Sequence, residues 1–486
     1  MKKHLIISAV AGSLIMSGAS AAPVYQPPGA NLVMGDVAFG PRASSTMGNP
    51  AAGASELDRL GDDAKTVTGL SISAGIEYGN VDDILALIDD LAANTEPSPP
   101  GSGGPDGGNP DEKPPGGGIE IPIDPELEET IKAIAAEVGT QAGVLALVQA
   151  EGYGKAFVST DIPIVLGREH LGGAWEFGIN VSGTSTAFGL AEPIEFDEEI
   201  AVAEIGRILE DAITGDPDEV YYIGGDDVIV TVDPDSGNVK IRFDNDSSLL
   251  TKAAVVSEFS ASYSREMWSS TVGKLYGGLD AKYYRVGLSR VSSRLGDITD
   301  SSELWQSIKD ADFNYSNGLG ADLGVLWSAG SYQLGATLTN INEPSFKYPS
   351  VDTSNYKDPV TIAFLERDDE YVMERQLRLE GSVFTANKHW GFNFGLDANK
   401  VPDPLGYNYQ WATISAAYST DSFWLPGVRF GLRKNLAGTK VTYLGAGVTA
   451  FKYVNLDLAS SFETTKINGT ELPRSLMVNL GFNVAF

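Results

Sequence analysis

The feature that most constrains the fold is a two-residue alternation of apolar and polar side chains that continues to the last residue. In the carboxy-terminal segment SLMVNLGFNVAF, apolar side chains occupy every second position and mostly small or polar ones lie between them. Strand side chains point to opposite faces with a period of two, so this segment is predicted to be a strand with one apolar face. The pattern recurs in YQLGATLTN, QLRLEGSVF and other segments from about residue 253 to residue 486.

Charged side chains stand in the middle of several of these segments, on the face opposite the apolar one. Arg378 and Glu380 are examples, and Asp457 is another. A membrane-spanning barrel with a wet interior requires this arrangement, with strands of about 9–11 residues. A soluble β-sandwich gives the same alternation with the apolar face inward, so the strands alone leave that alternative open.

The beginning of the chain favours the membrane barrel. Residues 1–21 read as an export signal, in which Lys2 and Lys3 precede an apolar stretch and ASA precedes Ala22. The apolar stretch is shorter than the ~20 residues that span a bilayer as a helix. We therefore expect cleavage after Ala21 and a location in the outer membrane, where lipid surrounds the barrel. A closed barrel pairs all backbone groups within lipid.

Composition excludes several classes of function. The chain has no cysteine, which excludes disulfides, thiolate chemistry and Cys-bearing zinc sites. Its net charge of −31 argues against nucleic acid as a partner, because phosphate binding needs clustered Lys and Arg. No cofactor is expected. We also expect no enzymatic activity, since His389 is the only plausible base for a serine hydrolase and an incidental surface histidine is the simpler interpretation.

The predicted fold is all-β: an antiparallel outer-membrane barrel of roughly 12–14 strands with an amino-terminal plug and helical loop insertions. Four segments are predicted: a signal peptide at 1–21, a hatch or plug at 22–66, a first strand with a loop insertion at 67–153, and the main barrel at 154–486.

Helical patterns interrupt the strands. The predicted helices cover 81–91, 125–138 and about 198–213, each with an apolar stripe rather than an apolar surface all round. A Pro/Gly-rich stretch at 96–119 is predicted to be a loop. The first two helices would then lie in the first external loop.

Weak candidates for metal binding lie between 195 and 238. DPDSGN offers the oxygens of Asp233, Asp235 and Asn238 to calcium, but it lacks a distal glutamate and joins VIVTV to VKIRF, so a hairpin turn is favoured. Acidic residues at 195 and 197–199 would bind divalent ions that bridge lipopolysaccharide, or form the acidic first turn of a helix, which is the favoured interpretation.

The tail carries a more specific pattern. Asn479, Gly481, Val484 and Phe486 resemble, in type and spacing, the assembly signal of bacterial outer-membrane barrels. The resemblance implies that the barrel-assembly machinery is a partner. The seven tryptophans, from Trp175 to Trp424, are interpreted as anchors at the membrane interfaces, with packing in a loop as the alternative for any one of them.

Two further resemblances concern function. SSTMGNPAAGAS, with Asn49, Pro50 and Ala51, is similar to the hatch segment of FadL-like long-chain fatty-acid transporters, although Asn-Pro also begins ordinary turns. LTNINEPSF, with EFSASYSREMW and LYGGLDAKYYRVGL before it, resembles the conjugal-transfer TraF-type outer-membrane family, which is related to FadL-like barrels. A periplasmic thioredoxin-like protein shares that name, but a chain without cysteine is no dithiol oxidoreductase.

These resemblances imply two alternative functions. One is a FadL-like channel or transporter for hydrophobic small molecules, with a plugged lumen. The other is an accessory or structural barrel that transports nothing and has conjugation or secretion components of the envelope as partners. An apolar pocket beneath the hatch would favour the first, and a lumen packed with charge pairs and without a cavity would favour the second.

Overall fold

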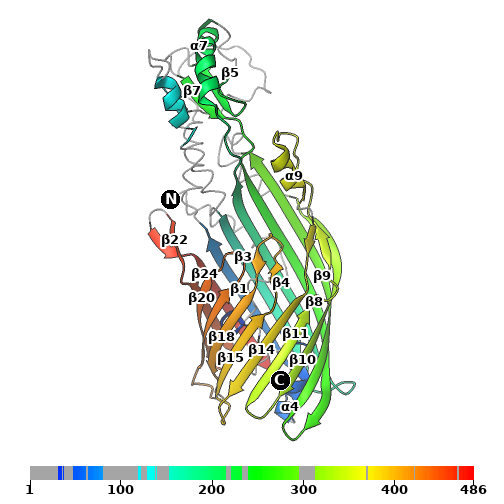
Figure 1. The fold of residues 1–486 in the computed structure, drawn as a ribbon. Helices are drawn as coiled ribbons and strands as arrows, with labels where there is room; N and C mark the ends of the chain where they lie inside the picture. Colours follow the sequence, from blue (N-terminus) through cyan, green and yellow to red (C-terminus); the bar gives the residue numbers. More distant parts are fainter. Residues whose placement is uncertain are drawn as a thin grey trace, which may run out of the picture.

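The structure is a computed structural model, in which fourteen antiparallel strands close into one barrel (Figure 1). It describes residues 31–35, 37, 48–61, 64–79, 119–121, 129–136, 138–139, 153–214, 221–232, 239–294, 312–367, 370–420, 422–467 and 470–486. The predicted signal peptide, the helix at 81–91 and nearly all of the loop at 96–119 lie outside these residues. The strand number agrees with the predicted range of 12–14.

The barrel strands follow the chain order around the wall. They are β1 (Val67–Tyr78), β3 (Tyr153–Val165), β4 (Ala174–Leu190), β8 (Ser248–Ser270), β9 (Gly273–Arg294), β10 (Asn314–Ser328), β11 (Tyr332–Thr339), β14 (Gln376–Phe384), β15 (Trp390–Asp397), β18 (Trp411–Tyr418), β19 (Gly427–Asn435), β20 (Thr442–Ala450), β21 (Val454–Ser461) and β24 (Ser475–Ala485). Closure joins β1 to β24, with Val67 opposite Ala485 and Ile76 opposite Leu476.

Connections differ at the two ends of the barrel. Short turns, such as residues 271–272 and 329–331, gather at the end where the chain finishes, and long connections gather at the other end. β8 and β9 are much longer than their neighbours and continue beyond them toward the long-loop end (Figure 1). The remaining elements there are β12 (Ser345–Lys347), α9 (Pro359–Arg367), β13 (Glu370–Val372), β16 (Val401–Pro402), β17 (Asn408–Tyr409), β22 (Thr464–Ile467) and β23 (Thr470–Pro473).

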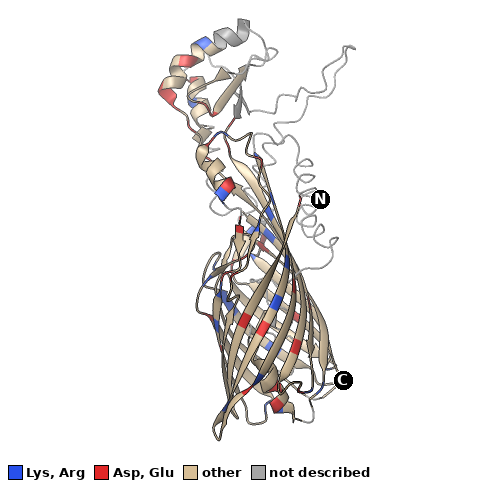
Figure 2. Cartoon of the chain, turned by 90° about the vertical axis from the view of Figure 1, so that its right-hand side faces the viewer, with Lys and Arg blue, Asp and Glu red and all other residues tan. Residues whose placement is uncertain are grey.

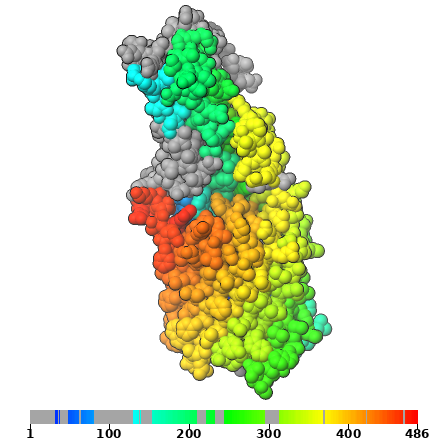
Figure 3. Space-filling view, viewed as in Figure 1, coloured from blue at the N-terminus to red at the C-terminus, as the bar shows by residue number. Residues whose placement is uncertain are grey.

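Apolar side chains face outward and polar ones inward, as the alternation predicts for a membrane barrel. On β24, Leu476, Val478 and Leu480 are exposed, whereas Met477 and Asn479 are buried in the interior. A soluble sandwich would bury the apolar face instead. The barrel wall in Figure 3 is therefore a surface suited to lipid.

An arginine on the outer face should destabilise the barrel. Leu334 is exposed, but it lies two residues from Tyr332 at the start of β11, close to the short-turn end. Leu323 on β10 lies farther into the wall, so Leu323→Arg is expected to cost the full ~2–4 kcal/mol of a site near the bilayer midplane, and Leu334→Arg less. Unfolding in urea, with the protein in lipid vesicles, measures the difference.

Thr337→Arg is the control on the inner face. Thr337 is buried inside the barrel, and the backbone pairs with β10 place it at nearly the height of Leu323. Arg378 lies opposite Thr337 on β14, so like-charge repulsion of up to ~1 kcal/mol is expected, still below the cost at Leu323. A larger loss at Thr337 than at Leu323 would mean that the faces are assigned the wrong way round.

Two insertions together form a small α/β unit beyond the barrel, which we call the head domain. Its sheet has the strand order β2-β7-β6-β5. Strand β2 (Ile119–Ile121) comes from the connection after β1. The connection after β4 supplies the other three strands: β5 (Tyr221–Tyr222), β6 (Val228–Val232) and β7 (Val239–Phe243). The helical residues 129–136 and 138–139 and helix α7 (Glu198–Thr214) pack against the sheet.

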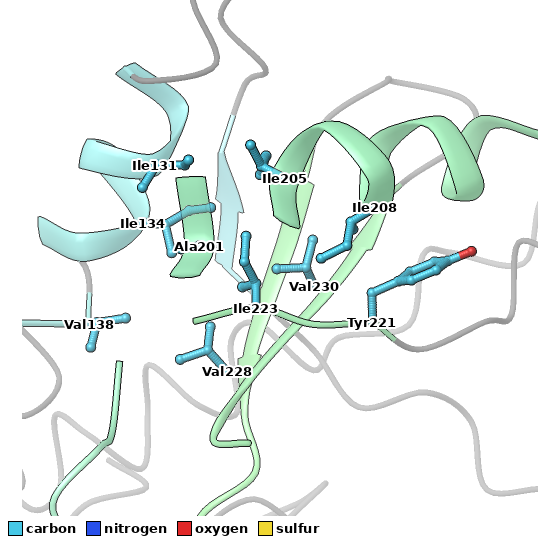
Figure 4. Close-up of a cluster of buried hydrophobic side chains, with 10 residues drawn as sticks. All are labelled: Ile131, Ile134, Val138, Ala201, Ile205, Ile208, Tyr221, Ile223, Val228 and Val230. Atoms are coloured by element: carbon cyan, nitrogen blue, oxygen red, sulfur yellow. The ribbon is translucent and has the colours of Figure 1, made fainter. Parts of the chain in front are cut away.

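The head domain has its own hydrophobic core. Figure 4 shows Ile131 and Ile134 from one insertion beside Ile205, Ile223 and Val230 from the other. Helices were predicted at 125–138 and 198–213, but their packing into one domain was not. The predicted boundaries at 67–153 and 154–486 remain predictions. The head domain contains residues from both of these predicted segments.

The net charge of the protein resides mainly in these two insertions. Residues 79–152 and 191–247 contain 32 of the 65 acidic residues but only 5 of the 34 basic ones. The rest of the sequence is close to neutral, and acidic and basic side chains both recur along the barrel strands (Figure 2). The strongly negative total charge therefore describes the insertions rather than the barrel.

Among the described residues, no helix is both long enough and apolar enough to cross a membrane.

Candidate functional site: the plugged lumen

The predicted hatch tripeptide lies inside the barrel. Asn49 is only 1% exposed, and its Nδ2 donates to Glu380 Oε1 at 2.6 Å and to the Val325 carbonyl at 3.3 Å. Asn49 Oδ1 accepts the backbone N–H of Ala51 at 2.9 Å, which closes a local turn through Pro50. The Asn-Pro-Ala segment is therefore both a turn and a contact with the barrel wall.

Glycines on the inner face of the wall make room for this segment. A Cβ on Gly324 would lie 2.2 Å from Asn49 Oδ1, and one on Gly278 would lie 2.2 Å from the Pro50 carbonyl oxygen. Both distances are too short for any side chain. The two glycines are directly opposite each other on β9 and β10, so they form one seat for the tripeptide.

Helix α4 (Ala52–Leu60) follows the tripeptide and lies against β4, β8, β9 and β10. The Ala54 N–H donates to Ser264 Oγ at 2.9 Å. Asp58 accepts from Lys274 Nζ at 2.6 Å and from the Tyr276 hydroxyl at 2.8 Å. Partial burial by itself raises the pKa of Asp58, but these hydrogen bonds outweigh burial and lower it. The stabilisation is therefore present above the pKa of Asp58 in the unfolded chain and is lost as pH falls through its lower folded value.

Helix α2 (Asn31–Met34) contacts the opposite part of the wall, on β18 to β21. A Cβ on Gly431 would lie 2.0 Å from the Val33 carbonyl oxygen, and one on Gly445 would lie 3.3 Å from Val33 Cα. Ser415 Oγ donates to the Met34 carbonyl at 3.2 Å. We call residues 31–37 and 48–61 the plug. Its two parts are seated on separate glycine patches of the inner wall.

Aromatic and aliphatic side chains fill much of the interior toward the long-loop end. One cluster combines Tyr284 and Val286 of β9 with Phe346, Tyr348 and Tyr371, which come from the long connection between β11 and β14. A second combines Leu32 of the plug with inward side chains of the wall and a loop residue: Phe157, Tyr409, Trp411, Val441, Tyr443, Ala459 and Met477. Through Leu32 the plug therefore touches an apolar cluster within an interior that is otherwise rich in polar side chains.

Charge pairs are buried in the same interior. Lys155 Nζ lies 2.6 Å from Asp403 Oδ2, and both side chains are almost completely buried. Arg429 is paired with Asp457, again with both side chains buried. Lys282 Nζ lies 2.8 Å from Asp322 Oδ2. The lumen thus contains charge pairs, the feature expected for the second function, and also packed apolar clusters, which are not by themselves the pocket expected for the first.

The four assembly-signal residues lie on β24 and just beyond it. Asn479 faces inward and accepts from Ser73 Oγ at 2.8 Å, across the seam with β1. Gly481 lies on the same inner face. The backbone of Phe486 pairs with Thr66 in both directions at 3.0 Å, while its side chain is 72% exposed. Recognition of the exposed ring during assembly remains a prediction.

Phe486→Asp is expected to lower the amount of membrane-inserted, heat-modifiable protein without blocking export, because the predicted assembly signal requires an aromatic ring at this position. Comparing the heat-modifiable fraction with the total exported protein measures this effect. Phe486→Tyr, which keeps an aromatic ring, is the matched control. Normal insertion of the aspartate variant would refute the assembly-signal interpretation.

The weak metal candidates do not come together. Asp233, Asp235 and Asn238 lie outside the described residues, although β6 and β7 on either side of them pair as the predicted hairpin. Asp197 Oδ1 accepts the N–H of Glu199 at 2.8 Å and that of Ile200 at 3.1 Å, so this acidic stretch begins helix α7, as favoured from the sequence. Among the described residues, no three acidic or histidine side chains are grouped closely enough to hold a metal ion.

Most described tryptophans lie near the short-turn end of the outer wall. Trp268 and Trp327 stack there with ring centroids 5.7 Å apart, and Trp390 packs on Tyr418. Trp411 differs: it faces the interior, with the Arg433 guanidinium 3.5 Å from its ring centroid. The interpretation of all seven tryptophans as interface anchors is therefore wrong for Trp411, because it sits on the inward parity of β18.

His389 lies in a turn at the short-turn end. Its Nδ1 is 3.2 Å from the Ser419 carbonyl oxygen, and its ring packs against Tyr418. The groups that the sequence did not identify are the wall partners of the plug: Glu380, Ser264, Lys274 and Tyr276. Each is an ordinary polar residue in its own segment, and only the closed barrel brings it to its partner.

A closed barrel with an apolar exterior and a plug inside defines a protein of the outer-membrane β-barrel class. The chain belongs to the family described as F plasmid transfer operon, TraF, protein, whose model matches residues 46–397. This agrees with the TraF-type resemblance of the sequence. Among curated proteins, none matches the chain.

Solved structures similar to this chain include FadL-type barrels. The P. putida toluene transporter TodX is 11% identical, with a TM-score of 0.38 over 95% of this chain and 98% of that one. The CymD monoaromatic hydrocarbon channel is 10% identical, with a TM-score of 0.41 over 95% and 98%. A Pseudomonas aeruginosa FadL homologue is 10% identical, with a TM-score of 0.34 over 96% and 99%. Likeness of this degree says nothing about what this chain binds.

Proposed function

We propose that the protein is a plugged outer-membrane channel that passes small hydrophobic molecules through its lumen. The observation that carries the proposal is the contact of Leu32, in the plug, with the buried aromatic cluster around Trp411 and Tyr443. Ligand pockets are mostly apolar and aromatic with a few placed polar groups. Movement of the plug would rearrange that cluster directly.

The plug is held by contacts that are individually weak. Asn49, Ala54 and the Met34 carbonyl each use one or two hydrogen bonds to the wall. A neutral bond contributes about 0.5–1.5 kcal/mol net, and the bond from Asn49 to the Glu380 carboxylate about 1.5–3 kcal/mol. The glycine seats provide a close fit without covalent attachment. We infer a plug that shifts to open a path, with the short turns on the periplasmic side and the head domain outside the cell.

A reversible cross-link tests this function. Val33→Cys with Gly445→Cys places two thiols across the contact between plug and wall, where a Cβ on residue 445 lies 3.3 Å from Val33 Cα. No native cysteine competes, because the chain has none. Uptake of propylbenzene into proteoliposomes is expected to be slow in the oxidised protein and to recover when a reductant is added.

Each single-cysteine variant is the matched control, and oxidation should not change its uptake. Equal uptake by the oxidised and reduced double variant would show that movement of this part of the plug is not needed. Uptake no faster than through protein-free lipid in every form would refute the channel.

The second candidate function is an accessory barrel of a conjugation or secretion system. The head domain favours it, since a separate domain with its own core offers a binding surface that transport of a small molecule does not require. The buried pairs Lys155–Asp403 and Arg429–Asp457 also suit a lumen that stays filled. Loss of propylbenzene uptake in all forms of the cross-linking experiment would favour this candidate.

A further inference from the structure

An unbalanced group of charges lies on the inner face of five neighbouring strands, β3, β4, β8, β9 and β10. We call it the acidic row. Backbone pairing places Asp161 opposite Asn180, and Asn180 opposite Glu258. It also places Asp280 opposite Asp322. Lys282 supplies the positive charge, with Nζ 2.8 Å from Asp322, 3.6 Å from Glu258 and 3.9 Å from Asp280. Glu258, Asp280 and Asp322 therefore share one ammonium group, and Asp161 adds a fourth carboxylate to the row.

The acidic row lies between the plug and the aromatic interior. Gly278 and Gly324, which seat the hatch tripeptide, are each two residues from Asp280 and Asp322 and share their inner face. In the other direction along β9, the next inward residues after Lys282 are Tyr284 and Val286, which belong to the first aromatic cluster. A molecule that passes between the plug and that cluster would meet the row.

Several acceptors of the row are buried without a donor. Among the described residues, Asp161 Oδ2, Asn180 Oδ1 and Asp280 Oδ1 have no hydrogen-bond partner. Their side chains belong to residues that are only 2%, 4% and 5% exposed. Asn180 uses its Nδ2 to donate to Asp161 Oδ1 at 3.3 Å, which leaves its own oxygen as a further acceptor. Unsatisfied buried acceptors cost free energy, and a ligand with N–H donors would remove that cost.

Other charge pairs in the lumen are balanced. Asp457 has Arg429, and Asp403 has Lys155, one cation for each carboxylate. The excess of carboxylates distinguishes the acidic row from these two pairs. A metal ion is not the expected occupant, because no three acidic side chains in the described part of the chain are grouped closely enough to coordinate one.

We propose that the acidic row binds the ammonium group of a hydrophobic amine, whose apolar part lies against the aromatic cluster around Tyr284. An ammonium group brings the positive charge and the N–H donors that Asp161, Asn180 and Asp280 lack. This inference rests on the proposed channel function and names its substrate class: small hydrophobic cations rather than anions. Such an interaction is strong because it lies away from water, where charges are less screened.

Equilibrium binding tests the inference independently of transport. Isothermal titration of the purified full chain with 2-phenylethylammonium, propylbenzene and 3-phenylpropanoate compares a cation, a neutral molecule and an anion of similar size. The cation is expected to bind at least tenfold more tightly than the anion, a difference of about 1.4 kcal/mol.

Asp161→Asn and Asp280→Asn, made separately, are expected to weaken cation binding about tenfold each and to leave propylbenzene binding unchanged. Both substitutions keep the side-chain shape, and heat-modifiability shows whether each variant folds. Asp352→Asn, at an exposed loop position, removes the same charge outside the lumen and should not alter binding.

The outcomes separate the two proposals. Equal binding of cation and anion by the native protein, or unchanged cation binding in both folded variants, would overturn the inference while leaving the channel intact. Failure of the reduced double-cysteine variant to take up propylbenzene would refute the channel. Absence of cation binding in the titration would refute the acidic row as an ammonium site, whatever the uptake.

Discussion

Deletion of residues 24–60 is expected to give a large, steady conductance in planar bilayers, whereas the intact protein is expected to conduct ions poorly. Fourteen strands enclose a wide lumen, since about eight already bring interior side chains just into contact. The deletion removes α2, the hatch tripeptide and α4, all of which lie against the inner wall. Wall glycines such as Gly324 and Gly431 would then face water.

Asn49→Ala is a milder change that tests the same plug. It removes the hydrogen bonds to Glu380 and Val325 but keeps the rest of the plug, so brief openings are expected instead of a steady pore. Both variants must first be shown to insert, by heat-modifiability. High and equal conductance of the intact and deleted proteins would mean that these residues do not block the lumen.

The alternation of side chains predicts the barrel because it is a local property of each strand. In YQLGATLTN, the sequence alone places Leu334 and Thr337 on opposite faces, and the structure confirms that one faces outward and the other inward. Strand lengths are less predictable. β8 and β9 have 23 and 22 residues, because their far ends pack against loops such as that of Tyr356 rather than against lipid.

The head domain could not be predicted from the same patterns. Its core joins Ile134 to Ile205, residues from two insertions separated by barrel strands β3 and β4. Each helix shows its apolar stripe in the sequence, but a stripe does not identify its partner. The concentration of acidic residues in the two insertions was visible as composition. The net charge of the whole chain does not show that the two insertions fold together as one unit.

The contacts of single plug residues could not be predicted from local sequence patterns either. Asn49 was identified from the resemblance of its tripeptide. Its partner Glu380 is 331 positions away, in a strand whose sequence gives no sign of this contact. Gly278 and Gly324 look like weak strand residues until the plug is seated on them. Contacts between the plug and the wall depend on closure of the barrel, so no local pattern contains them.

Asp457→Leu is expected to destabilise the barrel by about 3–5 kcal/mol, because it leaves the Arg429 guanidinium buried and unpaired. Asp457 is completely buried and accepts from Arg429 through both carboxylate oxygens, with Nη2 at 2.6 Å from Oδ2. It also accepts from Asn479 Nδ2 at 3.1 Å, which ties the pair to the last strand. Urea unfolding in lipid vesicles, followed by heat-modifiability, measures the loss.

The double variant Arg429→Met with Asp457→Leu tests the cause. Replacing both members of a buried ion pair by apolar groups is often neutral, so it is expected to regain most of the stability that the single change loses. Glu343→Gln, which weakens an exposed pair with Arg375, should change stability little. A double variant as unstable as Asp457→Leu would mean that the cost comes from lost packing at the wall, or from the lost bond to Asn479, and not from an uncompensated buried charge.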